Sequence, residues 1–292
     1  MFLGVDLGTS GIKVIITNDK GELVDSASAG LEVSRPKPLF SEQSPADWWQ
    51  AFNQAMETLA KGPHLANVKG IGLSGQMHGA VAIDKDDKVI RPAILWNDGR
   101  SFAECKALEK AVTNSREITG NIMMPGFTAP KLLWMKVHEP DSFARIAKVL
   151  LPKDYLRLLL SSPDSTSPYA SDMSDSAGTL WLNTKTRNWD ESLLKACGLS
   201  TEQMPDLYEG TEITGTLNNQ LAEKWGMQPN VPIIAGGGDN AAGAVGVGLI
   251  KPGQGMLSLG TSGVYFVVAD EYSAMPEMAV HSFCHALPDR WH

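Results

Sequence analysis

The pentapeptide LGTSG occurs twice in this chain, at residues 7–11 and again at residues 259–263. Each copy separates an apolar stretch from a β-branched one: FLGVD and IKVIIT flank the first, GMLS and VYFVVA the second. A strand, a Gly/Ser/Thr turn and a second strand form the pattern of a β-hairpin. A five-residue match arises by chance in roughly a few per cent of such chains, so the matching flanks carry the argument for an internal repeat.

The 292 residues are too many for one ordinary core and suit two domains. After the first hairpin, Asp19-Lys20-Gly21 predicts a turn into a third strand, which makes a meander. We place the domain boundary near residue 235, where alternating helices and strands give way to a new strand and hairpin. The polar stretch SSPDSTSPY, residues 161–169, is expected to be an exposed loop. Further strands are predicted near 68–73, 80–84, 93–96, 149–151 and 231–235, and helices near 45–59, 101–112, 152–160, 190–197 and 218–225.

Composition excludes several classes of protein. The net charge of −8 leaves no excess of cations for a phosphate backbone, so nucleic acid is not expected as the main partner. No apolar run approaches the length of a membrane span, and the N-terminus lacks the pattern of a signal peptide. The three cysteines are odd in number and scattered, which favours a reducing, cytoplasmic location over a disulfide framework.

Asp6 ends the first apolar strand directly before the Gly-rich turn. A carboxylate there must be solvated, paired or bound to a cation, because burying an unpaired charge is costly. The turn from Gly8 to Gly11 can direct backbone N–H groups at one point, which is how such loops bind phosphate. Lys13 either adds charge or points to solvent. A plain hairpin turn explains the pattern equally well.

Asp239 follows three glycines and precedes a small-residue helix, AAGAVGVG. Glycines let a ligand approach the backbone closely, and a carboxylate there can accept a proton from a substrate hydroxyl. The more common role at this place is a helix N-cap. His78, in GQMHG, can hydrogen-bond a polyol, but an isolated histidine is more often structural. His281, Cys284 and His285 do not have the spacing of a closed zinc site.

The order of these features resembles the FGGY family of carbohydrate kinases. The matching stretches follow the family order along nearly the whole chain: GVDLGTSGIKV, SGQMHGAV, AILWNDGR, MMPGFTAPKLLW, LLPKDYLRL, ASDMSDSAGTLW, AGGGDNAAGAVG, LSLGTSGVYF and VHSFCHALP. Within the family, GQMHG together with GGGDNAAGAVG is most similar to the members that act on xylulose.

The resemblance implies an α/β fold of two RNase H-like domains, of the actin/hexokinase/Hsp70 superfamily. Residues 1–235 correspond to the N-terminal, sugar-binding domain, and residues 236–292 correspond to the start of the C-terminal domain, which the chain leaves incomplete. The sugar and MgATP are then expected in the cleft between the domains. The implied reaction is ATP-dependent phosphorylation of D-xylulose to D-xylulose 5-phosphate, in xylose catabolism.

The resemblance also assigns roles to residues. Asp239 is the implied general base, and the sugar contacts correspond to Met77, His78, Asp239 and Asn240. Mg²⁺ is implied near Asp6, held through water. The ATP phosphates are expected to lie against Thr9, Ser10, Gly11 and Lys13 of the first hairpin and Gly260 and Thr261 of the second.

Two alternatives stay open from the sequence. One is a kinase for another ketose or polyol of the same family. The other is a truncated sugar-binding module without catalysis, because the chain ends at His292 while family members continue. The expected partners are the small molecules D-xylulose and ATP, with no nucleic acid and no membrane, and a homodimer is a possible assembly.

Overall fold

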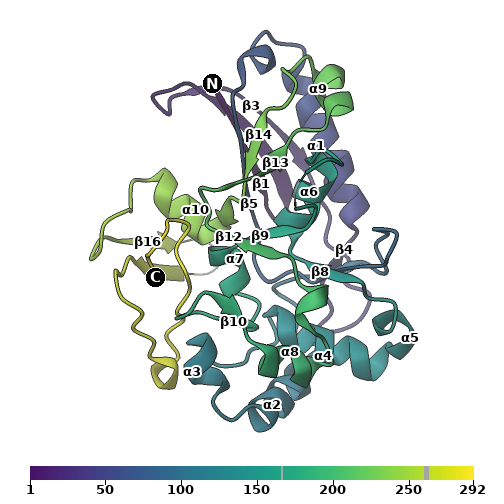
Figure 1. Ribbon diagram of the computed structural model, residues 1–292, viewed down its shortest axis with the longest axis vertical. Helices are drawn as coiled ribbons and strands as arrows, with labels where there is room; N and C mark the ends of the chain where they lie inside the picture. Colours follow the sequence, from purple (N-terminus) through teal and green to yellow (C-terminus); the bar gives the residue numbers. More distant parts are fainter. Residues whose placement is uncertain (166, 260–262) are drawn as a thin grey trace.

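The computed structural model describes residues 1–292 apart from Thr166 and residues 260–262 (Figure 1). Its main sheet has the strand order β13–β14–β5–β1–β2–β3, and β15 also pairs with β5. The strands β1, β2 and β3 form the predicted antiparallel meander, whereas β5 is parallel to β1 and β14 is parallel to β5. The bounds are β1 (Phe2–Leu7), β2 (Gly11–Thr17), β3 (Leu23–Gly30), β5 (Ile71–Gly75), β13 (Ile213–Thr216), β14 (Pro232–Ile234) and β15 (Gly237–Gly238).

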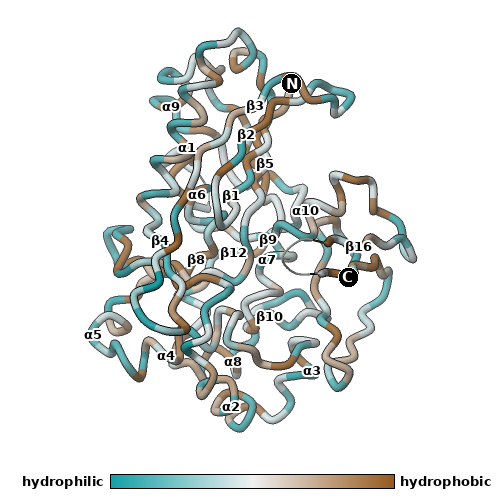
Figure 2. Tube along the Cα trace, turned by 180° about the vertical axis from the view of Figure 1, so that it is seen from behind, coloured by the Kyte–Doolittle hydropathy of each residue, from teal (hydrophilic) through white to brown (hydrophobic). Residues whose placement is uncertain are grey.

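One face of this sheet is covered by helices. In β2, Ile12, Val14 and Ile16 are buried while Lys13 between them is exposed, the period-2 pattern of a strand with one core face. The helix α1 (Pro45–Leu59) packs on β2 and β3 and buries Trp48 completely, with α6 (Pro152–Leu160) and α9 (Asn219–Trp225) beside it (Figure 1). Figure 2 shows hydrophobic stretches along β1, β2 and β5, which form the first core with these helices.

A second core lies in the lower part of the molecule in Figure 1, where helices predominate. Its largest fully buried side chain is Trp181. The helices there are α2 (Phe102–Ala111), α3 (Ser115–Thr119), α4 (Thr128–His138), α5 (Pro140–Phe143), α7 (Met173–Ala177) and α8 (Glu191–Cys197). The short strands are β4 (Glu42–Gln43), β6 (Val81–Ile83), β7 (Ala93–Ile94), β8 (Lys148–Leu150), β9 (Ala170–Asp172), β10 (Leu182–Asn183), β11 (Asn188–Trp189) and β12 (Asp206–Tyr208). The 3-10 turns are Leu65–Asn67, Thr201–Gln203 and, further on, Pro276–Met278.

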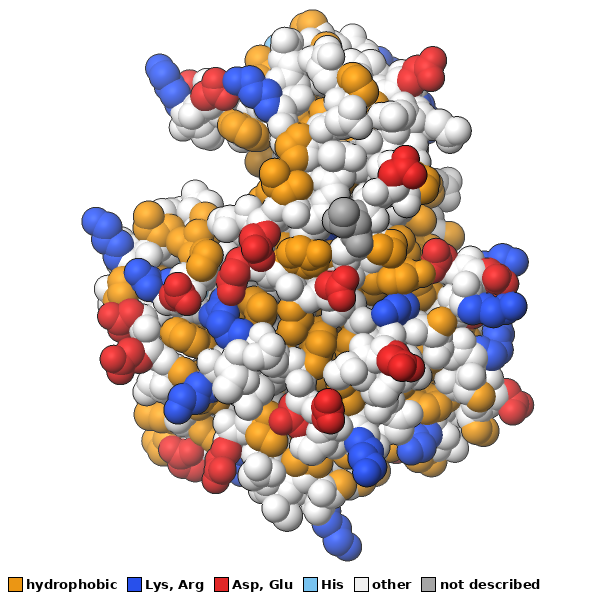
Figure 3. Space-filling view, in the orientation of Figure 1, with side chains coloured by type: hydrophobic (Ala, Val, Ile, Leu, Met, Phe, Trp, Pro, Cys, Tyr) orange, Lys and Arg blue, Asp and Glu red, His pale blue; other side chains and the backbone are white. Residues whose placement is uncertain are grey.

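The last part of the chain begins with α10 (Asp239–Gly246) and continues into the hairpin of β16 (Gly255–Leu259) and β17 (Gly263–Val267). The two strands are antiparallel, so both predicted LGTSG hairpins are confirmed. Phe266 packs with α10, whereas Cys284 returns to the second core. Figure 3 shows hydrophobic side chains on the surface at the left of the view, in the region of α10 and β16; Leu257 and Leu259 of β16 are among the exposed ones.

The start of α1 has no side-chain cap, because Ser44, directly before it, makes no capping hydrogen bond. The loop at residues 161–169, expected to be exposed, is only partly so in its described residues, which leave out Thr166, because the buried Arg157 guanidinium donates to the carbonyls of Ser167 and Pro168. The boundary at residue 235 stays a prediction; β15, just beyond it, pairs with β5 of the main sheet. Among the described residues, no helix has the length and apolarity to cross a membrane.

Candidate active site

A cavity of about 1510 Å³ lies between the loops that leave the main sheet and the C-terminal hairpin. Met77, His78 and Asn240, three of the four expected sugar contacts, line it. Aromatic side chains, among them Trp96 and Phe127, form other parts of the wall. Apolar walls with a few convergent polar groups are typical of small-molecule sites. The structure therefore brings together residues from four separate parts of the sequence.

Asp6 lies at the carboxyl end of β1, between Lys13 of β2 and Ser74 of β5 in the strand register. Its side chain reaches solvent. Burial against the surrounding protein raises the pKa of Asp6, and a hydrogen bond with Ser74 and the charge of Lys13 partly oppose this. Lys13 itself is exposed, so the strand alternation directs it to solvent while it still acts on Asp6 through its charge.

The turn between β1 and β2 is tight. The Gly8 N–H donates to the Gly11 carbonyl at 3.0 Å, and a Cβ on Gly11 would lie 2.8 Å from the Ala29 carbonyl oxygen. A side chain at Gly11 is thus excluded. Thr9 donates its hydroxyl to Gln76 Oε1 and accepts from Trp96 Nε1, both at 2.9 Å. Its hydroxyl therefore holds the turn in place.

Gln76 extends this network inward. Its Nε2 donates to Gln43 Oε1 at 3.0 Å, and Gln43 Nε2 donates to the Thr9 carbonyl at 2.7 Å. Trp48 Nε1 also donates to Gln43 Oε1. The chain of bonds connects the first hairpin to the bend that carries Met77 and His78. Sequence reasoning missed these glutamines, since only the fold shows that they are neighbours.

His78 has the left-handed backbone conformation, with φ of 67°, which is uncommon for a residue other than glycine. Its carbonyl accepts hydrogen bonds from Lys131 Nζ at 2.8 Å and from Thr128 Oγ1 at 3.1 Å. Its Nδ1 lies 2.7 Å from the Gly178 carbonyl oxygen. Strained backbone persists only where its surroundings hold it, and such residues cluster at functional sites.

The charge state of His78 follows from its surroundings. Burial lowers its pKa to about 3, so the imidazole is neutral at physiological pH. Because the Gly178 carbonyl can only accept, Nδ1 carries the proton. Nε2 is then an acceptor, suited to a sugar hydroxyl that donates.

Asp239 is the first residue of α10. It is not the N-cap, since Gly238 precedes the helix and the capping interpretation is therefore wrong. The backbone and side-chain nitrogens of Asn240 both donate to Asp239 Oδ1, at 2.7 and 3.1 Å. Burial raises the pKa of Asp239 to about 6; the Asn240 N–H lowers it, and the charge of Asp6 raises it further. The charge of Asp6 thus affects the protonation of Asp239.

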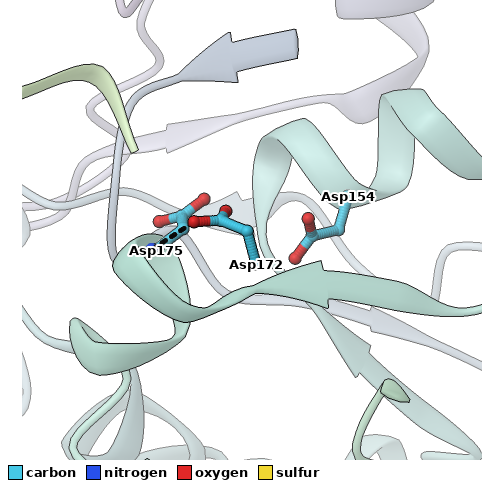
Figure 4. Close-up of side chains that lie close together, drawn as sticks. All are labelled: Asp154, Asp172 and Asp175. Carbon is cyan, nitrogen blue, oxygen red and sulfur yellow. Dashed lines mark hydrogen bonds between the residues drawn. The ribbon is translucent and has the colours of Figure 1, made fainter. Parts of the chain in front are cut away.

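A group of buried charges lies behind this site. Figure 4 shows Asp154, Asp172 and Asp175; one carboxylate oxygen from each lies within 4.8 Å of one from each of the others. Lys153 Nζ lies 2.5 Å from Asp154, 2.8 Å from Asp172 and 4.0 Å from Asp175. Burial lowers the pKa of Lys153, but the three carboxylates outweigh this and raise it. The ammonium therefore takes the place that a metal ion would have among these carboxylates.

The second hairpin is less fully described. Gly260 and Thr261, expected to contact phosphate, lie outside the described residues. The flanking residues Leu259 and Gly263 pair across the hairpin, and Gly263 also lines the cavity.

The family profile described as "FGGY family of carbohydrate kinases, N-terminal domain" matches residues 1–246. The chain belongs to the FGGY family. Its α/β structure accordingly has the actin/hexokinase-like fold of FGGY carbohydrate kinases, as the resemblance implied.

Curated relatives and solved structures agree with this membership. The chain is 59% identical to a xylulose kinase of Escherichia coli K12 and 56% identical to one of Klebsiella pneumoniae, over its whole length and 59% of theirs. The crystal structure of a "xyloylose kinase" from Brucella ovis superposes with a TM-score of 0.95 at 52% identity, covering 99% of this chain and 59% of that one. The chain thus spans 59% of the length of the FGGY relatives that it matches.

Proposed function

We propose that this chain forms the sugar-binding part of an ATP-dependent kinase that converts D-xylulose to D-xylulose 5-phosphate. The observation that carries the proposal is the cavity lined by Met77, His78 and Asn240, with Asp239 directly before Asn240 at the start of α10. The raised pKa of Asp239, about 6, suits a general base. The curated relatives, named xylulose kinases, support the choice of sugar.

The contacts of each site residue suit the role that we propose for it. The neutral His78 accepts a hydrogen bond from a sugar hydroxyl at Nε2. Because Asn240 bonds only Oδ1 of Asp239, Oδ2 receives no hydrogen bond from a described residue and is available for the attacking hydroxyl. Asp239 accepts that hydroxyl's proton as its oxygen bonds to the γ-phosphorus of ATP. The β1–β2 turn presents backbone N–H groups to the phosphates, with Thr9 holding its shape.

The region of Asp6 and Asp239 also fits a divalent cation. Both carboxylates have a raised pKa, and the charge of Asp6 contributes to the shift of Asp239. Carboxylate oxygens and water are the ligands that Mg²⁺ prefers, and Asp6 reaches solvent, so we assign it as the residue that holds Mg²⁺ through water. When bound, Mg²⁺ neutralises charge on the transferring phosphates.

Two measurements test this proposal. Calorimetry with this chain should show binding of D-xylulose, and the protein translated from its whole reading frame should phosphorylate D-xylulose faster than ribulose or glycerol. Equal or faster turnover of either competitor would indicate a kinase for another ketose or polyol. Sugar binding with no phosphorylation in the whole protein would favour the sugar-binding module.

The raised pKa of Asp239 predicts the acid limb of the activity profile. A general base acts only when deprotonated, so kcat/KM should fall about tenfold per pH unit below about pH 6. An ordinary aspartate, with a pKa of about 3.9, would keep nearly full activity at pH 5. Carbon-13 NMR of the Asp239 carboxyl in this chain checks the midpoint directly. Asp6→Asn should move that midpoint to lower pH, and a midpoint near 4 in the unmodified chain would contradict the assignment.

A further inference from the structure

The helix α7 and its two flanking residues, Asp172 and Gly178, lie next to the proposed site. Every residue of α7 is buried, including its polar ones. None has been assigned a role in sugar or phosphate binding above. One end nevertheless contacts Gly238, directly before Asp239, and the other end contacts His78.

The N-terminal end holds the glycine run before Asp239. Ser174 Oγ accepts a hydrogen bond from the Gly238 N–H at 3.1 Å and donates to Asp172 Oδ1 at 2.5 Å. Lys153 Nζ lies 2.8 Å from Asp172 and donates to the Ala235 carbonyl at 3.3 Å. Both ends of the run from Ala235 to Gly238 are thereby tied to one buried cluster.

The glycine run needs such support because of its conformation. Gly236 has a φ of 84°, and a Cβ there would lie 2.0 Å from the Leu73 carbonyl oxygen. Glycine residues have more conformational freedom than any others, so they define the direction of the next side chain poorly. Pairing with β5 fixes Gly237 and Gly238 along the sheet. The hydrogen bond from the Gly238 N–H to Ser174 Oγ then fixes the residue directly before Asp239.

The C-terminal end holds His78. The Gly178 carbonyl accepts from His78 Nδ1 at 2.7 Å and selects the tautomer with an unprotonated Nε2. The ring packs tightly against Gly178, since a Cβ there would lie 2.5 Å from Nδ1 and 2.6 Å from Cε1. Gly178 has a φ of −76°, which alanine also adopts, so a substitution acts through side-chain contacts and not through backbone strain: the two with His78 and a looser one, at 3.1 Å, with Met77 Cε.

We propose that α7 is a two-ended positioning element, in which Ser174 orients the general base Asp239 and Gly178 orients the sugar ligand His78. The inference rests on the proposed function. It assigns separate effects to the two ends: Ser174 governs turnover, and Gly178 governs affinity for the sugar.

The kinetic test uses the whole protein and three single substitutions. Ser174→Ala should lower kcat by roughly 10- to 100-fold, the scale of a displaced catalytic group, with KM for D-xylulose changed less than about twofold. Gly178→Ala should raise KM for D-xylulose by about tenfold or more, with a smaller effect on kcat. Ser176→Ala is the matched control, because its buried hydroxyl bonds only Ser171 among the described residues. Equal losses in Ser174→Ala and Ser176→Ala would overturn the proposal.

A second readout does not depend on kinase activity, and its first part uses only the unmodified chain. In the unmodified chain, the Gly238 amide should be protected from hydrogen exchange, and nitrogen-15 NMR should find the His78 proton on Nδ1. Ser174→Ala should speed exchange at Gly238 by about tenfold or more, and Ser176→Ala should not. An unprotected Gly238 amide or a proton on Nε2 would overturn the corresponding half. The two proposals can fail separately. If the Gly238 amide is protected and the His78 proton is on Nδ1, but the wild-type protein does not phosphorylate xylulose, the proposed function is wrong while α7 still orients Asp239 and His78.

Discussion

Asp239→Asn is expected to lower kcat for D-xylulose phosphorylation by roughly 10²- to 10⁴-fold, the usual contribution of a general base. The amide keeps the size of the side chain and an oxygen for the Asn240 bonds, but it cannot accept the proton. KM for the sugar should change little, because the amide has the size of the carboxylate and leaves the neighbouring Asn240, which lines the cavity, in place. Steady-state kinetics across a range of sugar concentrations separate the two quantities.

The same substitution should leave the fold intact. The carboxylate of Asp239 is less favourable in the folded chain than in water, as its raised pKa of about 6 indicates. Because the pKa of Asp239 is higher in the folded chain than in the unfolded one, the ionised carboxylate lowers the free energy of unfolding at pH values above that pKa. Removing its charge at pH 7 therefore costs no stability. The melting temperature of Asp239→Asn should therefore equal or exceed that of the unmodified chain.

Asp190→Asn provides the matched control. Asp190 is the N-cap of α8, where it accepts from the backbone N–H groups of Ser192 and Leu193, and asparagine caps helices equally well. Neither Asp190 nor the residues on either side of it line the cavity, whereas Asp239 directly precedes Asn240, which does. Activity retained in Asp190→Asn and lost in Asp239→Asn would support the base role, whereas full activity in Asp239→Asn would remove it.

Much of the fold near the site could be predicted from local pattern. The alternation in IKVIIT and the turn at Asp19-Lys20-Gly21 define the meander, and both hairpins lie where LGTSG places them. Met77, His78 and Asn240, to which the family resemblance assigns sugar contacts, line one cavity, and their role in sugar binding stays a prediction. Such features depend on residues adjacent in the chain or on motifs that a family keeps together.

The supporting network could not be predicted in this way. Gln43, Gln76 and Trp96 are separated by tens of residues, and only the packed fold shows that all three converge on Thr9. The same holds for the link between Gly178 and His78, which are 100 positions apart. Hydrogen-bond partners of this kind leave no periodic signal in the sequence, because the two residues of each pair are far apart along the chain.

The LLPKDYLRL stretch illustrates the difficulty most clearly. Pro152 at the start and the leucines that follow predict α6 correctly. Lysine and aspartate in the first turn are ordinarily solvated, yet Lys153 and Asp154 are fully buried here. Their burial depends on Asp172 and Asp175, which arrive from a different element. The energetic importance of Lys153 is thus visible only in the folded chain.

Lys153→Met is expected to destabilise the chain by about 3–5 kcal/mol, the usual result of removing one partner from a buried ion cluster. Methionine fills a similar volume but leaves Asp154 and Asp172 without the ammonium that lies 2.5 and 2.8 Å from them. Urea denaturation at constant m-value measures the change. Lys69→Met, which removes an exposed ion pair with Asp19, should shift stability by no more than about 0.5 kcal/mol.

The pH dependence of the stability lost in Lys153→Met distinguishes removal of the ammonium from a packing defect. Without the ammonium, the buried carboxylates have pKa values raised above those of the unfolded chain, so their folded forms bind protons more readily. The stability lost at pH 7 should then be partly regained as the pH falls toward 5, whereas a packing defect would cost the same at both. Asp175→Asn supplies the converse case. Burial already raises the pKa of Asp175 well above its usual value, so its amide should be tolerated at pH 7. A large loss of stability in Asp175→Asn, or a Lys153→Met defect independent of pH, would contradict this account of the cluster.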